Sequence, residues 1–417
     1  MKKMDFVQIL VLFFIFLLAV PVSSFAQEKE DGFTFGGAVR YNIMSTNYES
    51  DPTALSTSAT WDTWRLNVDG SMKGVDLSFE YRFYPTFGSH FIHHGWLGYE
   101  FSDNVYMKLG VHQVPFGITK YASHSWWFQG PYYVGLEDDY DMGIKFDLGF
   151  IENLDLAIAY YRQAEPEGPI FSGDVTFGGA GAGRYSYDMV PTTNINVREL
   201  NQFNLRSAYH INDDIEIGIS AQVGQNYNAV LEESETSTAF AGHVLANFAG
   251  FNFKGEYVKY NYNAKDNVGT DLDIVNMGAY GFGYDVAKEA SMYVAGIAYG
   301  IDVEWGPISN IQPYVDFTLT DKANENFENT YQLVPGALVT AGSIYMYVDF
   351  AMGKNQPWLH DTADFGVGLG QGRVYSDDAA AQGTDYYTND ASMVGKPVPI
   401  EDLEWNTRFN INLGYYF

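Results

Sequence analysis

The chain has 417 residues, no cysteine, and 23 basic against 52 acidic residues, which gives a net charge of −29. This balance argues against nucleic-acid binding, which needs a basic footprint, and against attachment to anionic lipid. The length allows roughly two or three soluble domains or one large barrel. The lack of cysteine is compatible with an oxidising compartment and a fold without disulfides.

The N-terminal segment has the parts of a secretory signal peptide. Lys2 and Lys3 precede the apolar run VQILVLFFIFLLAVPV, and the small residues Ser24 and Ala26 follow it. We predict cleavage after Ala26, so that residues 1–26 are a signal peptide and 27–417 form the mature chain. The alternative is an uncleaved anchor helix, which the short apolar run disfavours.

The mature chain alternates apolar and polar residues in short stretches, which predicts strands with one apolar and one polar face. In the final stretch, RFNINLGYYF, every second residue from Phe409 to Phe417 is apolar. We predict strands at 33–43, 63–72, 75–83, 95–101, 105–112, 141–150, 154–163, 201–211, 215–224, 238–248, 251–262, 291–303, 310–320, 331–340, 343–353 and 408–417.

Short and long connections alternate between these strands. Tight links such as 73–74 are followed by longer ones, which include 86–94, 225–237 and 354–403. This rhythm is typical of a bacterial outer-membrane barrel, with short periplasmic turns and long extracellular loops. A further candidate strand, DIVNMGAYGFGY at 273–284, alternates poorly and would make the strand number odd, so we assign it to a loop.

These observations predict an all-β fold: a transmembrane antiparallel β-barrel of 16 strands formed by residues 27–417 as one domain. In hydrocarbon every backbone polar group must be paired, so the last strand is expected to pair with the first. A barrel of this size is too wide for side chains to fill, and a water channel should remain.

The inward side of the alternation carries the charged residues. Arg408, Arg40, Arg65 and Arg82 fall on four adjacent strands once the barrel closes, and should form one basic arc. The inward acids Asp302, Asp316 and Asp349 lie further round. The predicted channel-lining residues are Arg40, Arg65, Arg82, Arg408, Lys108, Lys145 and Glu80. Local pairing, for example of Glu80 with Arg82, and a functional field across the pore both remain open.

The connection 113–140 is rich in aromatic and acidic residues, which should not stay in water. We expect it to fold into the lumen as a constriction loop, with its acids facing the basic arc; the alternatives are a cap over the outer mouth or packing on a partner subunit. Its candidate site residues are Lys120, Trp126, Trp127, Glu137, Asp138, Asp139 and Asp141.

Four stretches carry a family resemblance: QVPFG after a strand, GLEDDYDMGIKF, YVDFAMGKNQPWL, and the terminal RFNINLGYYF. They resemble Gram-negative outer-membrane porins, in particular the phosphate-selective porin O and P group. The resemblance implies a homotrimeric pore of sixteen strands whose third long loop enters the lumen. It also implies that Tyr415 and Phe417 form an assembly signal read by the barrel-assembly machinery. Phosphate specialists of that group cluster Arg and Lys at the constriction, whereas this loop offers only Lys120.

The predicted function is therefore passive diffusion of small hydrophilic solutes or ions through the outer membrane, with a weak cation or neutral-sugar preference set by the acidic balance. A substrate-selective channel for sugars or phosphate is the main alternative, followed by an outer-membrane enzyme or an adhesive surface protein.

No nucleophile–base set stands out, so we expect no enzyme activity and no cofactor. His90, His93 and His94 lack a ligand pattern, so we expect no metal site. The expected partners are outer-membrane lipid and lipopolysaccharide.

Overall fold

The computed structural model describes residues 31–48, 55, 57–119, 121–168, 183–192, 195–325, 327–359, 373–374, 397–398 and 405–417. The predicted signal peptide, Lys120 and most of the 354–403 connection lie outside the described residues. None of the described helices is long and apolar enough to cross a membrane.

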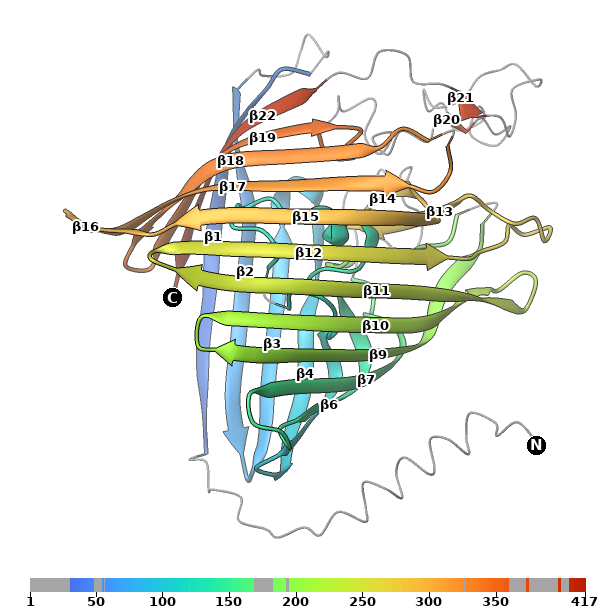
Figure 1. The fold of residues 1–417 in the computed structure, drawn as a ribbon, viewed down its shortest axis with the longest axis horizontal. Helices are drawn as coiled ribbons and strands as arrows, with labels where there is room; N and C mark the ends of the chain where they lie inside the picture. Colours follow the sequence, from blue (N-terminus) through green and yellow to red (C-terminus); the bar gives the residue numbers. More distant parts are fainter. Residues whose placement is uncertain are drawn as a thin grey trace.

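Antiparallel strands form nearly all of the regular structure (Figure 1). The strands of the main sheet are β1 (Gly32–Thr46), β2 (Thr57–Met72), β3 (Val75–Tyr84), β4 (Ser89–Ser102), β5 (Val105–Gln113), β6 (Tyr140–Leu148), β7 (Leu154–Ala164), β9 (Val197–Asn212), β10 (Ile215–Asn228), β11 (Glu233–Phe248), β12 (Phe251–Tyr262), β15 (Glu289–Tyr299), β16 (Ile301–Trp305), β17 (Ile308–Lys322), β18 (Thr330–Ala341), β19 (Ile344–Lys354) and β22 (Asn406–Tyr416). The shorter elements are η1 (Pro85–Phe87), η2 (Gly130–Val134), β8 (Asp188–Met189), β13 (Ile274–Ala279), β14 (Phe282–Ala287), β20 (Arg373–Val374) and β21 (Pro397–Val398).

The main sheet closes on itself, as predicted. β22 pairs with β19 on one side and with β1 on the other, in the register Ala38↔Tyr416. Beyond the strand end, Gly37 N donates to the Phe417 carbonyl at 2.9 Å and Phe417 N donates back at 3.1 Å. A Cβ on Gly37 would lie 2.3 Å from the Arg65 carbonyl oxygen, so only glycine fits at this close approach of strands. The terminal residue is thus part of the closed wall.

The predicted number of sixteen wall strands is confirmed. The sheet contains 17 segments, but β15 and β16 are two parts of one strand. β16 keeps the register of β15 on β17, with Ala298↔Tyr314 followed by Ile301↔Ile311. The stretch 273–284, assigned to a loop, stays out of the barrel: β13 and β14 form a hairpin that pairs with β8 in a separate small sheet.

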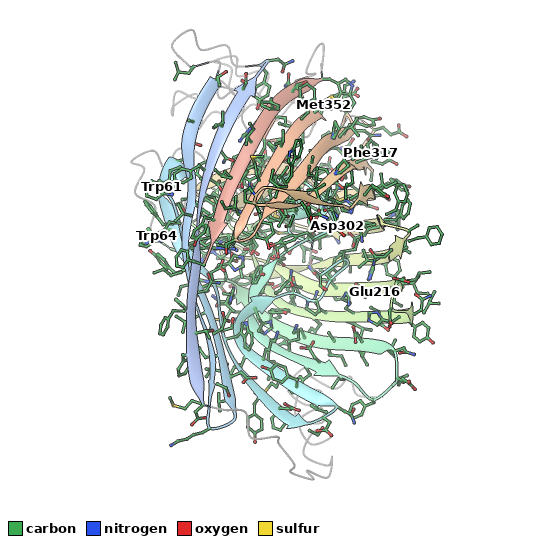
Figure 2. All side chains as sticks on the ribbon, turned by 90° about the vertical axis from the view of Figure 1, so that its left-hand side faces the viewer. Trp61, Trp64, Glu216, Asp302, Phe317 and Met352 are labelled. Atoms are coloured by element: carbon green, nitrogen blue, oxygen red, sulfur yellow. The ribbon has the colours of Figure 1, made fainter. Side chains whose placement is uncertain are left out.

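The barrel exposes its apolar side chains outward. Along β22, Phe409, Leu413 and Tyr415 are 38%, 42% and 52% exposed, whereas Asn410 and Asn412 are almost fully buried. Figure 2 shows Trp61 and Trp64 on the outside of the wall in the same way. So much exposed apolar surface is unfavourable in water and suits the hydrocarbon of a membrane.

Two predicted long connections are shorter than expected. β4 already begins at Ser89, so the prediction of a loop over 86–94 was wrong, and η1 with Gly88 makes the turn. The connection 225–237 also shortens, because β10 runs to Asn228 and β11 starts at Glu233. The ends of β10 and β11 carry polar residues on both faces, and the start of β4 carries apolar residues on both, Phe91 inward and Ile92 outward, so neither stretch shows a clear alternation.

Candidate functional site

The segment 113–140 contacts the inner face of the wall formed by β9, β10, β12, β17 and β18, which we call the docking wall. Asp316 of β17 is completely buried, and its carboxylate accepts hydrogen bonds from the backbone N–H groups of His124 and Ser125, at 2.6 and 2.8 Å. The Nδ1 atom of His124 lies 2.7 Å from the same carboxylate. Bonds to a buried carboxylate are strong, so Asp316 is the main anchor of this segment.

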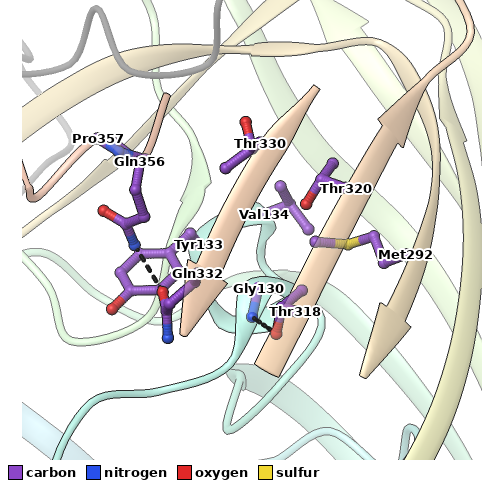
Figure 3. A pocket seen from close by; sticks show the side chains of 10 residues that line it. All are labelled: Gly130, Tyr133, Val134, Met292, Thr318, Thr320, Thr330, Gln332, Gln356 and Pro357. Carbon is purple, nitrogen blue, oxygen red and sulfur yellow. Dashed lines mark hydrogen bonds between the residues drawn. The ribbon is translucent and has the colours of Figure 1, made fainter. Parts of the chain in front are cut away.

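Further anchors hold the segment on both sides of Asp316. Gly130 N donates to Thr318 Oγ1 at 3.1 Å, and Gln332 Nε2 donates to the Phe128 carbonyl at 2.6 Å. Figure 3 shows Gly130 against β17, where a Cβ would lie 2.5 Å from the Thr318 methyl group. On β12, Lys254 Nζ donates to the Tyr121 and Ser123 carbonyls at 2.8 and 2.7 Å. The segment therefore runs from β5 across the barrel interior.

A cavity of about 570 Å³ lies between this segment and the strands β22, β1, β2 and β3, which we call the arginine wall. Arg40, Arg65, Arg82 and Arg408 all line it, so the structure brings the four predicted arginines together. Across from them are aromatic side chains of the segment, including Trp126. The other aromatic lining residues are Tyr84, Phe87, Tyr121, Trp127, Phe128, Tyr132, Tyr133, Tyr185, Tyr187, Tyr280, Tyr345, Tyr347, Trp358 and Tyr416.

Carboxylates compensate the arginines only in part. Arg40 Nη2 lies 2.8 Å from Asp62 Oδ2, and Arg65 Nη1 lies 3.7 Å from Glu80 Oε1. Arg82 also pairs with Glu80. Glu80 is buried beneath these two arginines and is not among the residues that line the cavity. Because one carboxylate serves two guanidinium groups, the cavity surface keeps an excess of positive charge.

Aromatic rings orient the arginines. The guanidinium of Arg82 lies over the Tyr185 ring at 4.5 Å, and that of Arg65 over the Tyr416 ring at 4.8 Å. Arg408 lies 5.0 Å from the Trp127 ring and has no carboxylate partner among the described residues. Stacking on a ring face holds a guanidinium in place while leaving its N–H donors available.

The acids of the segment are buried at its base, where Asp138 interacts with the charge of Arg82. Glu137, Asp138, Asp139 and Asp141 are all buried and none lines the cavity. Glu137 accepts from Ala122 N at 2.9 Å, and Asp138 accepts from Tyr185 Oη at 2.6 Å. These acids satisfy backbone and side-chain donors at the base of the segment, so they cannot also project into the lumen.

Burial perturbs two of these acids. It raises the pKa of the Glu137 carboxyl well above its ordinary value, and the neighbouring Glu256 carboxylate adds to the rise. It also raises the pKa of Asp138 to about 6, although the hydrogen bond from Tyr185 and the charge of Arg82 oppose the rise. Both shifts follow from removing a carboxylate from water.

Two predicted lysines lie away from this cavity. Lys108 Nζ lies 4.4 Å from the Trp96 ring centre, and Lys145 Nζ lies 3.4 Å from Asp147 Oδ1. Lys145 lines a second cavity of about 570 Å³, which reaches the short turn at 103–104 and the start of the segment. The segment 113–140 thus separates two cavities inside the barrel.

Asp302, predicted to face the lumen, is exposed on β16, in a hairpin that projects beyond the rim (Figures 1 and 2).

Sequence reasoning missed several lining residues. Asp62 is the extra residue of a β-bulge, where Arg40 pairs with Thr63 but Tyr41 pairs with Trp61. The bulge shifts the alternation by one, so that Trp61 turns outward and Asp62 turns toward Arg40. Tyr185 lies in a connection without a strand pattern, and Tyr280 lies in the poorly alternating stretch 273–284, at the turn between β13 and β14. Their only signal in the sequence is a high tyrosine content.

The comparisons with known proteins identify the fold. No family model and no curated protein matches the chain. An anion-selective porin from Comamonas acidovorans matches with a TM-score of 0.57 and 12% identity, over 93% of this chain and 100% of that chain. OmpT of Vibrio cholerae in its trimer form gives 0.54 and 12%, over 93% and 100%. The outer-membrane channel DcaP of Acinetobacter baumannii gives 0.53 and 11%, over 94% and 99%.

At these identities the likeness concerns the fold alone. The chain has the closed sixteen-stranded barrel of outer-membrane porins. The resemblance to the phosphate-selective group stays a prediction.

Proposed function

We propose that this protein is an outer-membrane porin that lets small hydrophilic solutes diffuse passively through its lumen. The observation that supports this best is the barrel itself: its outer face is apolar, and its inner face is lined by charged and polar side chains around internal cavities. In this proposal the segment 113–140 acts as the constriction loop, and the mature chain lies in the outer membrane after removal of residues 1–26.

We further propose that the pore prefers anions at the constriction. The whole chain is acidic, but among the described residues Asp62 alone contributes a carboxylate to the main cavity, against four arginines. Ion preference is set by the charges that line the narrow part of a pore, because distant charges are screened within about 10 Å at ordinary salt. The composition-based expectation of a cation preference therefore carries less weight than the local charge.

Planar-bilayer recording of the purified mature protein tests both steps. A steady ohmic conductance is expected, and a reversal potential in a KCl gradient should show that chloride permeates better than potassium. A folded barrel without any conductance would refute the channel. A potassium preference would keep the channel but refute the role given to the arginines.

A sugar channel is the second candidate, and the ring-lined cavity favours it. Aromatic faces such as those of Trp126 and Tyr121 line the cavity beside arginine donors, an arrangement that suits polyhydroxylated solutes. Liposome swelling distinguishes the two: a neutral disaccharide should enter faster than an amino acid of smaller size if sugars are selected, and more slowly if the pore only sieves by size.

We propose a homotrimer as the assembled state. The barrel matches OmpT of Vibrio cholerae in its trimer form, and the exposed apolar wall offers surface for subunit contact. Crosslinking of the protein in native membranes, followed by electrophoresis without boiling, should give a band of three chains. A single-chain band from folded protein would contradict this.

A further inference from the structure

A cluster of carboxylates lies outside the main cavity, at the base of the constriction loop. Asp139 ends that segment, Asp141 belongs to β6, and Asp188 opens β8. Their side chains are 4%, 2% and 1% exposed, and one carboxylate oxygen from each lies within 4.8 Å of the others. Glu165, the residue after β7, is also buried and interacts with Asp188.

The charges in this cluster are poorly compensated. Arg184 is the basic partner of Asp188, with Nη1 at 3.0 Å from Oδ2. No other ion pair to these four carboxylates is found in the part of the chain that the structure describes. Several buried carboxylates around one guanidinium leave negative charge in a low-dielectric site, which is costly unless a cation or protons neutralise it.

A second observation concerns the individual oxygens. Protein donors hold one oxygen of each of three carboxylates: Gln202 Nε2 donates to Asp141 Oδ2, Arg184 to Asp188 Oδ2, and Ser186 N and Oγ to Glu165 Oε1. The other oxygen of each, Asp141 Oδ1, Asp188 Oδ1 and Glu165 Oε2, is buried with no donor among the described residues, and so is Asp139 Oδ1. Carboxylates that ligate a metal show this arrangement, because one oxygen is oriented by the protein and the other faces the ion.

We propose that Asp139, Asp141 and Asp188 bind a divalent cation of the size of Ca²⁺, with Glu165 beside them. The cluster offers oxygen atoms and no imidazole or thiolate, which is the ligand set of a hard cation. Ca²⁺ bonds to oxygen at about 2.3–2.6 Å, so two of its ligands can lie up to roughly 5 Å apart. A spacing of at most 4.8 Å is compatible with this shell.

The ion would join three parts of the molecule. Asp139 fixes the end of the constriction loop, Asp141 the wall, and Asp188 the outer segment 183–192. That segment pairs with β13 through Met189 and carries Tyr185 and Tyr187, which line the main cavity. Binding would therefore stabilise the aromatic side of the cavity, although binding itself does not depend on the proposed channel function.

Calorimetry on the mature protein in detergent micelles, stripped with EDTA and titrated with CaCl₂, tests the site. One Ca²⁺ per chain is expected. Asp139→Asn and Asp188→Asn should each weaken binding at least tenfold, whereas Asp103→Asn, in an exposed short turn, should leave it unchanged. Failure of the folded wild-type barrel to bind Ca²⁺, or equal binding by all three variants, would overturn the proposal.

A second measurement covers the case in which the variants do not fold. Tb³⁺ takes the place of Ca²⁺ at oxygen sites, and Tyr140, between the two aspartates in sequence, should sensitise its luminescence in the wild-type protein. We expect a luminescent signal that one equivalent of Tb³⁺ saturates and that excess Ca²⁺ removes. No tyrosine-sensitised signal, or one that Ca²⁺ cannot displace, would refute the site without any variant.

Discussion

The arginine wall and the docking wall both point every second side chain inward, but these inward side chains make different contacts. On the arginine wall the inward side chains are long, and Arg40 and Arg65 remain partly exposed, at 16% and 19% of their side-chain surface. On the docking wall Asp316, Thr318 and Gln332 are shorter and fully buried under the constriction loop. On the docking wall, side chains that include Lys254 bond directly to the loop backbone, whereas the four arginines of the arginine wall line a cavity between the wall and the loop.

The largest expected effect comes from the docking wall. Asp316→Ala removes the acceptor for the backbone N–H groups of His124 and Ser125 and leaves these donors buried and unpaired. We expect the free energy of unfolding to fall by about 4 kcal/mol, because hydrogen bonds to a buried charge are lost together. Thermal unfolding followed by circular dichroism would show this, and single-channel conductance should become larger and noisier.

Asp316→Asn is the matched control, since it keeps the shape and one acceptor oxygen. Its unfolding temperature should lie between those of the wild type and Asp316→Ala. If Asp316→Ala left both conductance and unfolding unchanged, the contrast between the two walls would fail, because the loop would be held by other contacts.

A smaller effect is expected where the constriction loop turns. Gly135 has φ +75°, and a Cβ there would lie 2.3 Å from the Tyr187 carbonyl oxygen. Gly135→Ala should destabilise the protein by about 2 kcal/mol or more, since strain and a backbone clash add. Gly342→Ala provides the comparison, because Gly342 has φ +60° but no atom within 4 Å of its Cβ position. Equal losses in urea titrations of the two variants would show that the clash with Tyr187 is absent.

The third prediction concerns the arginine wall alone. Arg408→Gln removes a cation that has no carboxylate partner among the described residues. One unit charge about 5 Å from a permeating ion in water is worth about 0.8 kcal/mol, attractive for chloride and repulsive for potassium, so the chloride-to-potassium permeability ratio should fall roughly 16-fold. Lys259→Gln serves as control, since Lys259 is exposed and pairs with Glu289 at 3.2 Å. A similar shift in reversal potential for both variants would contradict a local role of Arg408.

The smallest thermodynamic effect is expected at the seam. The side chain of Phe417 is 58% exposed, while its backbone pairs with Gly37. Phe417→Ala should therefore change the stability of the refolded barrel by less than about 1 kcal/mol. If Tyr415 and Phe417 form an assembly signal, the amount of barrel inserted in cells should nevertheless drop, and more for Phe417→Ala than for Ile411→Ala. Normal insertion of Phe417→Ala, or an equal loss for both variants, would contradict that role of the terminal aromatics.

The fold could be predicted in detail because the rule behind it is local. Successive side chains of a strand point to opposite faces, so residues such as Asn410 and Leu413 reveal inside and outside without knowledge of their neighbours. The same rule, with the even strand number, kept 273–284 out of the wall. It was less informative at the outer strand ends, because residues near Glu233 are polar on both faces and those near Ser89 include Phe91 inward and Ile92 outward.

The candidate site could be predicted only in part. The four arginines follow from alternation and closure alone, and the structure brings them to one cavity. The partner of Arg40 depends on a bulge at Asp62 that shifts the pattern by one residue, and the acids of the constriction loop are buried at its base and do not line the cavity. Neither the bulge nor the position of these acids can be predicted from the residues next to them in the chain.

The sequence by itself thus determined which face of each strand meets lipid, how the wall closes, and which cations face inward, because pleating and backbone pairing act between neighbouring residues. Only the tertiary structure decided which residues face those cations across the cavity. The path of the constriction loop depends on contacts such as His124 with Asp316, which are 192 residues apart in the chain. Contacts over such separations arise when the barrel closes around the loop, and no periodicity along the chain encodes them.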